Sequence, residues 1–144
     1  MANYNGLRIS MNTFIEDNFS DYTIVFDENF ADPETFEAGA KWITPVYGPC
    51  SPDTTVKEIE LFIICFAKGD TEGLEASKMV DKVLSSFDDP TMPDGNKRIP
   101  FYVVQDGTRV VVSSIFASDT KVLDSDRLGD STTVLPVKIR LQWC

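Results

Sequence analysis

Carboxylates are the side chains with which this sequence could do chemistry, because its 144 residues include 23 aspartates and glutamates and no histidine. Without imidazole, a Ser-His-Asp or Cys-His nucleophile and a histidine metal ligand are excluded. The densest carboxylate cluster lies in residues 27–37 and consists of Asp27, Glu28, Asp32, Glu34 and Glu37. Such a density of oxygen ligands suits a hard cation, but the spacing does not match a calcium-binding loop. A solvated acidic loop is therefore the preferred interpretation, and a metal site is the alternative.

The other residue patterns that could support catalysis or ligand binding are weaker evidence than the acidic segment. Glu58 or Glu60 could form a paired-carboxylate hydrolase with an aspartate elsewhere, but spacing alone does not bring two carboxylates together. Gly69 and Asp70 do not form a glycine-rich phosphate cradle of the required length. The three cysteines are too far apart for a Cys-x-x-Cys motif and are expected to be free thiols. We therefore expect no catalytic residue, no metal and no cofactor.

The charge balance limits the partners. With 13 lysines and arginines, the formal net charge is −10, so direct clamping of nucleic acid is not expected. Residues 1–50 sum to −6, residues 51–100 to −4 and residues 101–144 to zero. No signal peptide and no apolar run long enough to cross a bilayer is seen, so we expect synthesis in a cytoplasm and no membrane partner.

Periodicity predicts the elements that would carry these residues. Apolar side chains at helical spacing predict helices over residues 5–18 and 76–87, the second one capped by Asp70 or Thr71. Strands are expected over residues 22–26, 41–47 and 56–66, the last entering the centre of a sheet. Pro45 indicates an edge position or a bulge. Residues 49–53 are expected to form a turn.

The C-terminal third contains the clearest strands. Asp106-Gly107 between residues 101–105 and 108–112 predicts a hairpin with a two-residue turn. Residues 117–133 are expected to be a long polar loop, and residues 135–143 alternate as a strand with one buried face. The predicted fold is therefore a single α+β domain, residues 1–144, with a mainly antiparallel sheet of about six strands and two helices packed on one face.

Most aromatic residues, including Trp42, Phe66, Phe116 and Trp143, are expected to pack in the core. Phe30 and Phe36 differ, because they lie within the acidic segment. They are candidate anchors for a protein partner, or the loop folds back over the sheet.

The order of these elements resembles the tail terminator proteins of long-tailed bacteriophages. The residues that carry the likeness are Ile24-Val25-Phe26-Asp27-Glu28 with Phe30, the long strand Val56-Lys57-Glu58-Ile59-Glu60-Leu61-Phe62-Ile63, the helix from Ala76 to Phe87, and Val137-Lys138-Ile139-Arg140-Leu141-Gln142-Trp143. The likeness spans most of the chain and is a pattern of elements. The connection over residues 117–133 matches no feature of the family.

The resemblance implies a structural virion protein and not an enzyme. Members of this family form a hexameric ring that caps the tail tube, stops its polymerisation and joins the tail to the head connector in the neck of the virion. DNA then passes through the ring lumen without specific binding, and an acidic lumen would repel its phosphates. Contacts are expected on long loops, so the nominated interface residues are Asp27, Glu28, Phe30, Asp32, Glu34, Phe36 and Glu37 in one loop and Lys121, Asp124, Asp126, Arg127 and Asp130 in the other.

Two alternatives remain open. Another head–tail joining protein, for head closure or tail completion, would share the ring architecture. A small soluble acidic enzyme or an acidic bacterial adaptor would be a different class of protein. If the chain is an enzyme, we expect a deep pocket with converging carboxylates. If it is a ring protein, we expect an oligomer or assembly onto tubes.

Overall fold

The central feature of the fold is a pair of long strands from opposite halves of the chain. The computed structural model describes residues 4–26, 37, 39–51, 56–128 and 132–144. Strand β3 (Lys57–Ala67) lies antiparallel to β7 (Thr132–Trp143) in an unbroken register from Lys57↔Trp143 to Ala67↔Thr133. Alternate residues of both strands are fully buried, which confirms the predicted central strand and the predicted C-terminal strand.

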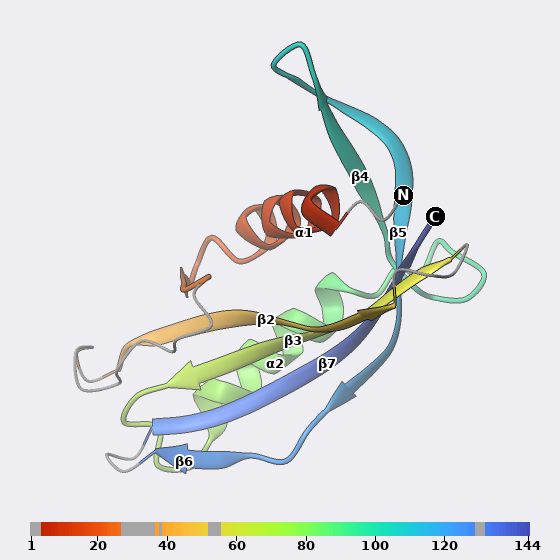
Figure 1. Ribbon diagram of the computed structural model, residues 1–144. Helices are drawn as coiled ribbons and strands as arrows, with labels where there is room; N and C mark the ends of the chain where they lie inside the picture. Colours follow the sequence, from red (N-terminus) through yellow and green to blue (C-terminus); the bar gives the residue numbers. More distant parts are fainter. Residues whose placement is uncertain (1–3, 27–36, 38, 52–55, 129–131) are drawn as a thin grey trace.

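The other strands extend this pair into a mixed, curled sheet in the order β1-β2-β3-β7-β5-β4, with β6 paired to β7 (Figure 1). The remaining strands are β1 (Thr23–Ile24), β2 (Lys41–Ser51), β4 (Arg98–Gln105), β5 (Thr108–Val122) and β6 (Asp126–Leu128). The α+β class is confirmed. The sheet is not purely antiparallel, because β1 pairs with β2 in parallel, and β1 is shorter than the predicted strand over residues 22–26.

The hairpin between β4 and β5 is confirmed. Asp106 and Gly107 have φ angles of 51° and 75°, which the predicted two-residue turn requires. Both strands are longer than predicted, and a bulge between Phe101 and Tyr102 leaves Val112 without a cross-strand partner.

Two segments that were predicted to lack regular structure are wholly or partly strands. The polar stretch 117–133 contains the end of β5, all of β6 and the start of β7. The backbones of the β5 and β6 parts pair with β7 despite their polar side chains, and Thr132 and Thr133 of β7 pair with β6. Residues 49–51 of the predicted turn continue β2, in which Cys50 pairs with Ile59 after a bulge. The rest of that turn lies outside the described residues.

Four prolines occur within strands, namely Pro45 and Pro49 in β2, Pro100 in β4 and Pro136 in β7. Pro49 lies in the bulge of β2 between Tyr47 and Cys50. The carbonyl of Ile43 accepts a hydrogen bond from the Val25 N–H, so the backbone groups of Ile43 point to the outer edge of β2. Strand residues two positions apart point to the same edge, and the nitrogen of Pro45 therefore lies on this outer edge as well. Its predicted edge position is thereby explained. The carbonyl of Pro136 accepts a hydrogen bond from the Leu123 N–H, in the connection between β5 and β6. Because the nitrogen and the carbonyl of one strand residue point to the same edge, the Pro136 nitrogen also faces this connection. Prolines at sheet edges limit further pairing.

Helices α1 (Tyr4–Asn18) and α2 (Leu74–Ser86) agree with the predicted helices to within a few residues. Their apolar stripes join a core cluster that includes Ile59, Leu61 and Ile63 of β3. The rings of Phe14 in α1 and Phe87, directly after α2, lie 5.2 Å apart. Within the described part of the chain, neither helix has the length and apolarity needed to cross a bilayer.

Helix α1 is tied to the outer edge of β4 by a buried hydroxyl. The Ser10 Oγ donates to the carbonyl of Gly6 at 2.7 Å and accepts the N–H of Tyr102 at 2.8 Å. By the two-residue repeat of a strand, Pro100 directs its nitrogen to this same edge. The edge of β4 is therefore closed by a helix and a proline. The Arg109 guanidinium adds a bond to Thr13 at 2.9 Å.

We expect Ser10→Ala to lower the free energy of unfolding by about 1–3 kcal/mol, because the Tyr102 N–H loses its acceptor in a partly buried position. Urea denaturation measures the change. Ser77→Ala is the matched control, since Ser77 makes the same bond to the carbonyl four residues earlier but is exposed. A Ser10→Ala variant as stable as Ser77→Ala would contradict the assigned role of this hydroxyl.

Candidate interaction surface

One face of the sheet carries the even-numbered residues of β3 and β7, and we call it the even face. The odd-numbered residues of these strands point to the opposite side and enter the core. By register, the even face continues onto Phe116 of β5, opposite Gln142, and onto Arg98 of β4, opposite Phe116. It therefore runs across the sheet from β2 to the hairpin.

The middle of the even face is a band of paired charges. Lys138 bonds Glu60 at 3.1 Å, and Arg140 pairs with both Glu58 and Asp119, the latter at 2.9 Å. The β3–β7 pairs are diagonal, because Glu60 lies opposite Arg140 in the register, and long side chains reach across such diagonals. Glu58 and Glu60, the candidate hydrolase carboxylates, are therefore held in salt bridges on an open sheet face.

Apolar side chains lie on both sides of this band. Towards β2 they include Val46, Phe62, Ile64 and Pro136, all partly buried, beside the buried and stacked rings of Trp42 and Phe66, 5.0 Å apart. Towards the hairpin, Phe116 is 40% exposed and lies under the Arg98 guanidinium at 4.8 Å. Phe116 was predicted to be a core residue, and this prediction is wrong because β5 turns its even side to the surface.

The hairpin projects beyond the rest of the sheet as an arm, residues 101–114 (Figure 1). β7 pairs with β5 only from Phe116 onward, so the arm is a two-stranded ribbon. Four of its valines are exposed, namely Val104, Val110, Val111 and Val112. Sequence reasoning found the hairpin but not this surface, because a β-branched run predicts a strand whether or not anything covers it.

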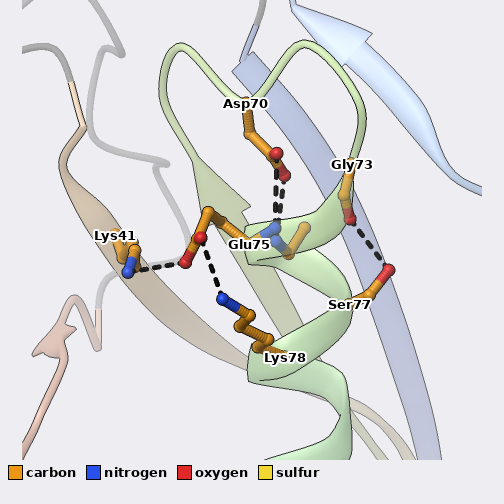
Figure 2. Close-up of polar contacts among 7 residues, drawn as sticks. Lys41, Asp70, Gly73, Glu75, Ser77 and Lys78 are labelled. Carbon is orange, nitrogen blue, oxygen red and sulfur yellow. Dashed lines mark hydrogen bonds and ion pairs between the residues drawn. The ribbon is translucent and has the colours of Figure 1, made fainter.

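A second polar cluster surrounds the start of α2 (Figure 2). The Asp70 carboxylate, 8% exposed, accepts the backbone N–H groups of Ala76 at 2.9 Å and Glu75 at 3.3 Å. It therefore caps the helix, as predicted, while Gly73 occupies the N-cap position with a φ of 75°. Lys41 bonds Glu75 at 2.8 Å and ties β2 to the helix.

The nominated interface residues separate into two groups. Asp27, Glu28, Phe30, Asp32, Glu34, Phe36 and Asp130 lie outside the described residues. Glu37, Lys121, Asp124 and Asp126 are exposed. Arg127 is also exposed, and its guanidinium donates to the carbonyls of Asp70, at 3.3 Å, and Thr71 in the loop before α2.

The cysteines are all free thiols, as expected. Cys65 is buried in the core, and burial raises its pKa to about 12, so it is unreactive at neutral pH. Cys50 is partly buried in β2, and Cys144 is exposed after β7. Among the described residues, no group of three or more cysteine and carboxylate side chains is arranged to hold a metal ion.

Comparison with protein-family models and with curated protein sequences finds no match to this chain.

We expect Asp70→Ala to lower the free energy of unfolding by about 0.5–2 kcal/mol, since two N–H groups at the start of α2 lose their acceptor. Thermal or urea denaturation measures the loss. Asp81→Ala, which removes an exposed carboxylate from the same helix, should change the stability by no more than about 0.5 kcal/mol. Equal effects of the two substitutions would refute the capping role.

The Glu75 carboxylate should give the stability a small acid dependence. Its hydrogen bonds from Lys41 and then Lys78 lower its pKa below the usual 4.5. A lowered pKa in the folded state stabilises the protein above the unfolded-state value, and this contribution is lost as the pH falls through the folded-state pKa. We therefore expect the difference in urea midpoint between wild type and Glu75→Gln to be present at neutral pH and to shrink below pH 4.5. A difference that does not change with pH would contradict this linkage.

Proposed function

We propose that this chain is a tail terminator, a non-enzymatic virion protein that caps a phage tail tube as a ring and joins it to the neck. The observation that carries the proposal is the order of elements: helix, short strand, two long strands, second helix, hairpin and final strand. This is the order on which the family resemblance depends. The short β6 is an addition that falls in the segment without a counterpart in the family.

The division of the sheet into two faces supports a role in assembly. We propose that both helices cover the odd-numbered face, since Phe14 and Phe87 are in contact and the apolar stripes of both helices share one core cluster. The even face would then be left for partners. It combines partly exposed apolar side chains with salt bridges that are themselves half-exposed, a mixture typical of protein interfaces.

The acidic charge supports the proposed passage of DNA. A lumen lined by carboxylates would repel phosphates, and exposed carboxylates such as Glu37, Asp124 and Asp126 are available for such a lining. The formal charge of −10 would be repeated in every subunit of the ring. The virion neck is the proposed location, after synthesis in the bacterial cytoplasm, and the tail tube protein and the neck connector are the proposed partners.

The decisive experiment adds the purified protein to growing tail tubes assembled from the tube protein of the same genome. We expect tube growth to stop at a length set by the time of addition, measured by electron microscopy. An equal concentration of an unrelated acidic protein is the control. Tubes that keep growing would overturn the proposal, and binding to head connectors alone would assign the chain to head closure.

A further inference from the structure

We propose that Asp106, in the turn of the arm, is a site of spontaneous isomerisation, in which the peptide bond to Gly107 moves onto the aspartate side chain. The inference goes beyond the proposed function and does not depend on it. An aspartate followed by glycine favours this reaction, because glycine has no Cβ to hinder the attack of its nitrogen. The chain has two Asp-Gly pairs, Asp94-Gly95 and Asp106-Gly107, and the fold places them in different surroundings.

The reaction needs no reagent besides water and leaves the composition of the chain unchanged. The Gly107 nitrogen attacks the side-chain carboxyl carbon of Asp106. A C–N bond forms, and one carboxyl oxygen leaves as water with the protons of the carboxyl and the amide, which gives a five-membered succinimide. Water then cleaves the bond from the Gly107 nitrogen to the main-chain carbonyl carbon of Asp106. That carbonyl becomes a free carboxylate, and the main chain of the resulting isoaspartate runs through the former side chain.

Both groups that react at Asp106 are accessible. Within the part of the chain that the structure describes, neither the Asp106 carboxylate nor the Gly107 N–H has a hydrogen-bond partner. In a hairpin with a two-residue turn, the pairing falls to the flanking residues, here Gln105 and Thr108. Both turn residues are exposed, and a Cβ placed on Gly107 would meet no atom within 4 Å. Neither the approach of the nitrogen nor the entry of water is obstructed.

Both corresponding groups of the Asp94-Gly95 pair are engaged. The Asp94 carboxylate accepts the Asn96 N–H at 3.0 Å and the Arg98 guanidinium at 3.3 Å. The Gly95 N–H donates to the carbonyl of Met92 at 3.0 Å. The Asn96 N–H and then the Arg98 guanidinium also hold the pKa of Asp94 below its usual value, whereas water leaves from the protonated carboxyl. Attack at Asp94 therefore requires these bonds to break first.

The arm also permits the change of conformation that the attack needs. The turn lies at the far end of a two-stranded ribbon (Figure 1), beyond the bonds that tie Tyr102 and Arg109 to α1. Two-stranded ribbons are only marginally stable in water, so the tip opens more readily than the core strands. Asp106 has a φ of 51°, a left-handed conformation that residues other than glycine adopt at some cost. Opening of the turn lets the Gly107 nitrogen reach the carboxyl carbon.

Isomerisation at Asp106 changes the arm. The isoaspartate adds one methylene to the main chain of a two-residue turn, and the length of the turn fixes the register of the hairpin. The bond between Ser10 and Tyr102 lies at the base of the arm and is not altered. We therefore expect amides of residues 103–105 and 108–110 to exchange faster with solvent after isomerisation, while those of β3 and β7 stay unchanged.

Ageing of the folded protein at neutral pH tests the proposal. Peptides taken at intervals are analysed by mass spectrometry with a fragmentation that distinguishes isoaspartate from aspartate. We expect isoaspartate to accumulate at Asp106 at least about tenfold faster than at Asp94, because reaction at Asp94 must first break its hydrogen bonds. The same chain unfolded in urea is the control, in which both positions should isomerise at similar rates. Equal rates at the two aspartates in the folded protein would overturn the proposal.

Labelling with a methyltransferase specific for isoaspartate gives a second readout on aged, folded variants. All of them carry Asn5→Gln, so that no label comes from the Asn5-Gly6 pair. Asp106→Gly suits the positive φ of the turn and lacks the carboxyl, so it should lose most of the label, whereas Asp94→Ala should keep it. An Asp106→Gly variant labelled like its parent would also overturn the proposal. Isoaspartate at Asp106 without faster exchange in residues 103–105 and 108–110 would overturn the loosening of the arm alone.

Discussion

The structure depends on the pairing of β3 with β7. These strands lie far apart in the sequence, and their register is continuous along the whole of β3. Each buries an alternating row of aliphatic side chains, and each fully buried side chain stabilises the fold by about 1.5–3 kcal/mol. β2 is added on one side of the pair and β5 and β6 on the other, while α2 packs against both central strands. A shift of one residue in this register would move the apolar row to the opposite face, so the hydrophobic pattern fixes it.

Around this pair, the fold covers parts of its strand edges, while among the described strands none pairs with the outer edge of β5 along Thr108 to Ser114. β2 is covered at its start by β1 and carries Pro45 beyond it, and the edge of β4 is occupied by α1 through Ser10. The arm extends past the end of β7, and this difference in strand length creates the open edge of β5. The even face, which we propose for assembly, is formed by the same strands that build the core, and no separate domain is needed.

Much of the fold could be predicted from the sequence because its signals were local. The stripe of α1, the alternation of residues 137–143 and the Asp106-Gly107 turn are each determined by neighbouring residues. Within the polar stretch 117–133, residues 117–122, 126–128 and 132–133 were wrongly predicted to be loop. Strand pairing uses backbone groups, so the polarity of the side chains does not indicate whether a segment pairs. The bonds from the Arg127 guanidinium to carbonyls of the loop before α2, more than fifty residues earlier, could not be predicted either, because no local pattern indicates them.

The sequence by itself determined the two helices, most of the strands, the hairpin turn and the excess of negative charge, since each follows from composition or from contacts between near neighbours. The tertiary structure decided which valines stay in solvent, which carboxylates are paired with cations and which parts of the strand edges are unpaired. Those properties depend on where distant strands end relative to one another, and relative strand length becomes visible only when β4, β5 and β7 lie side by side.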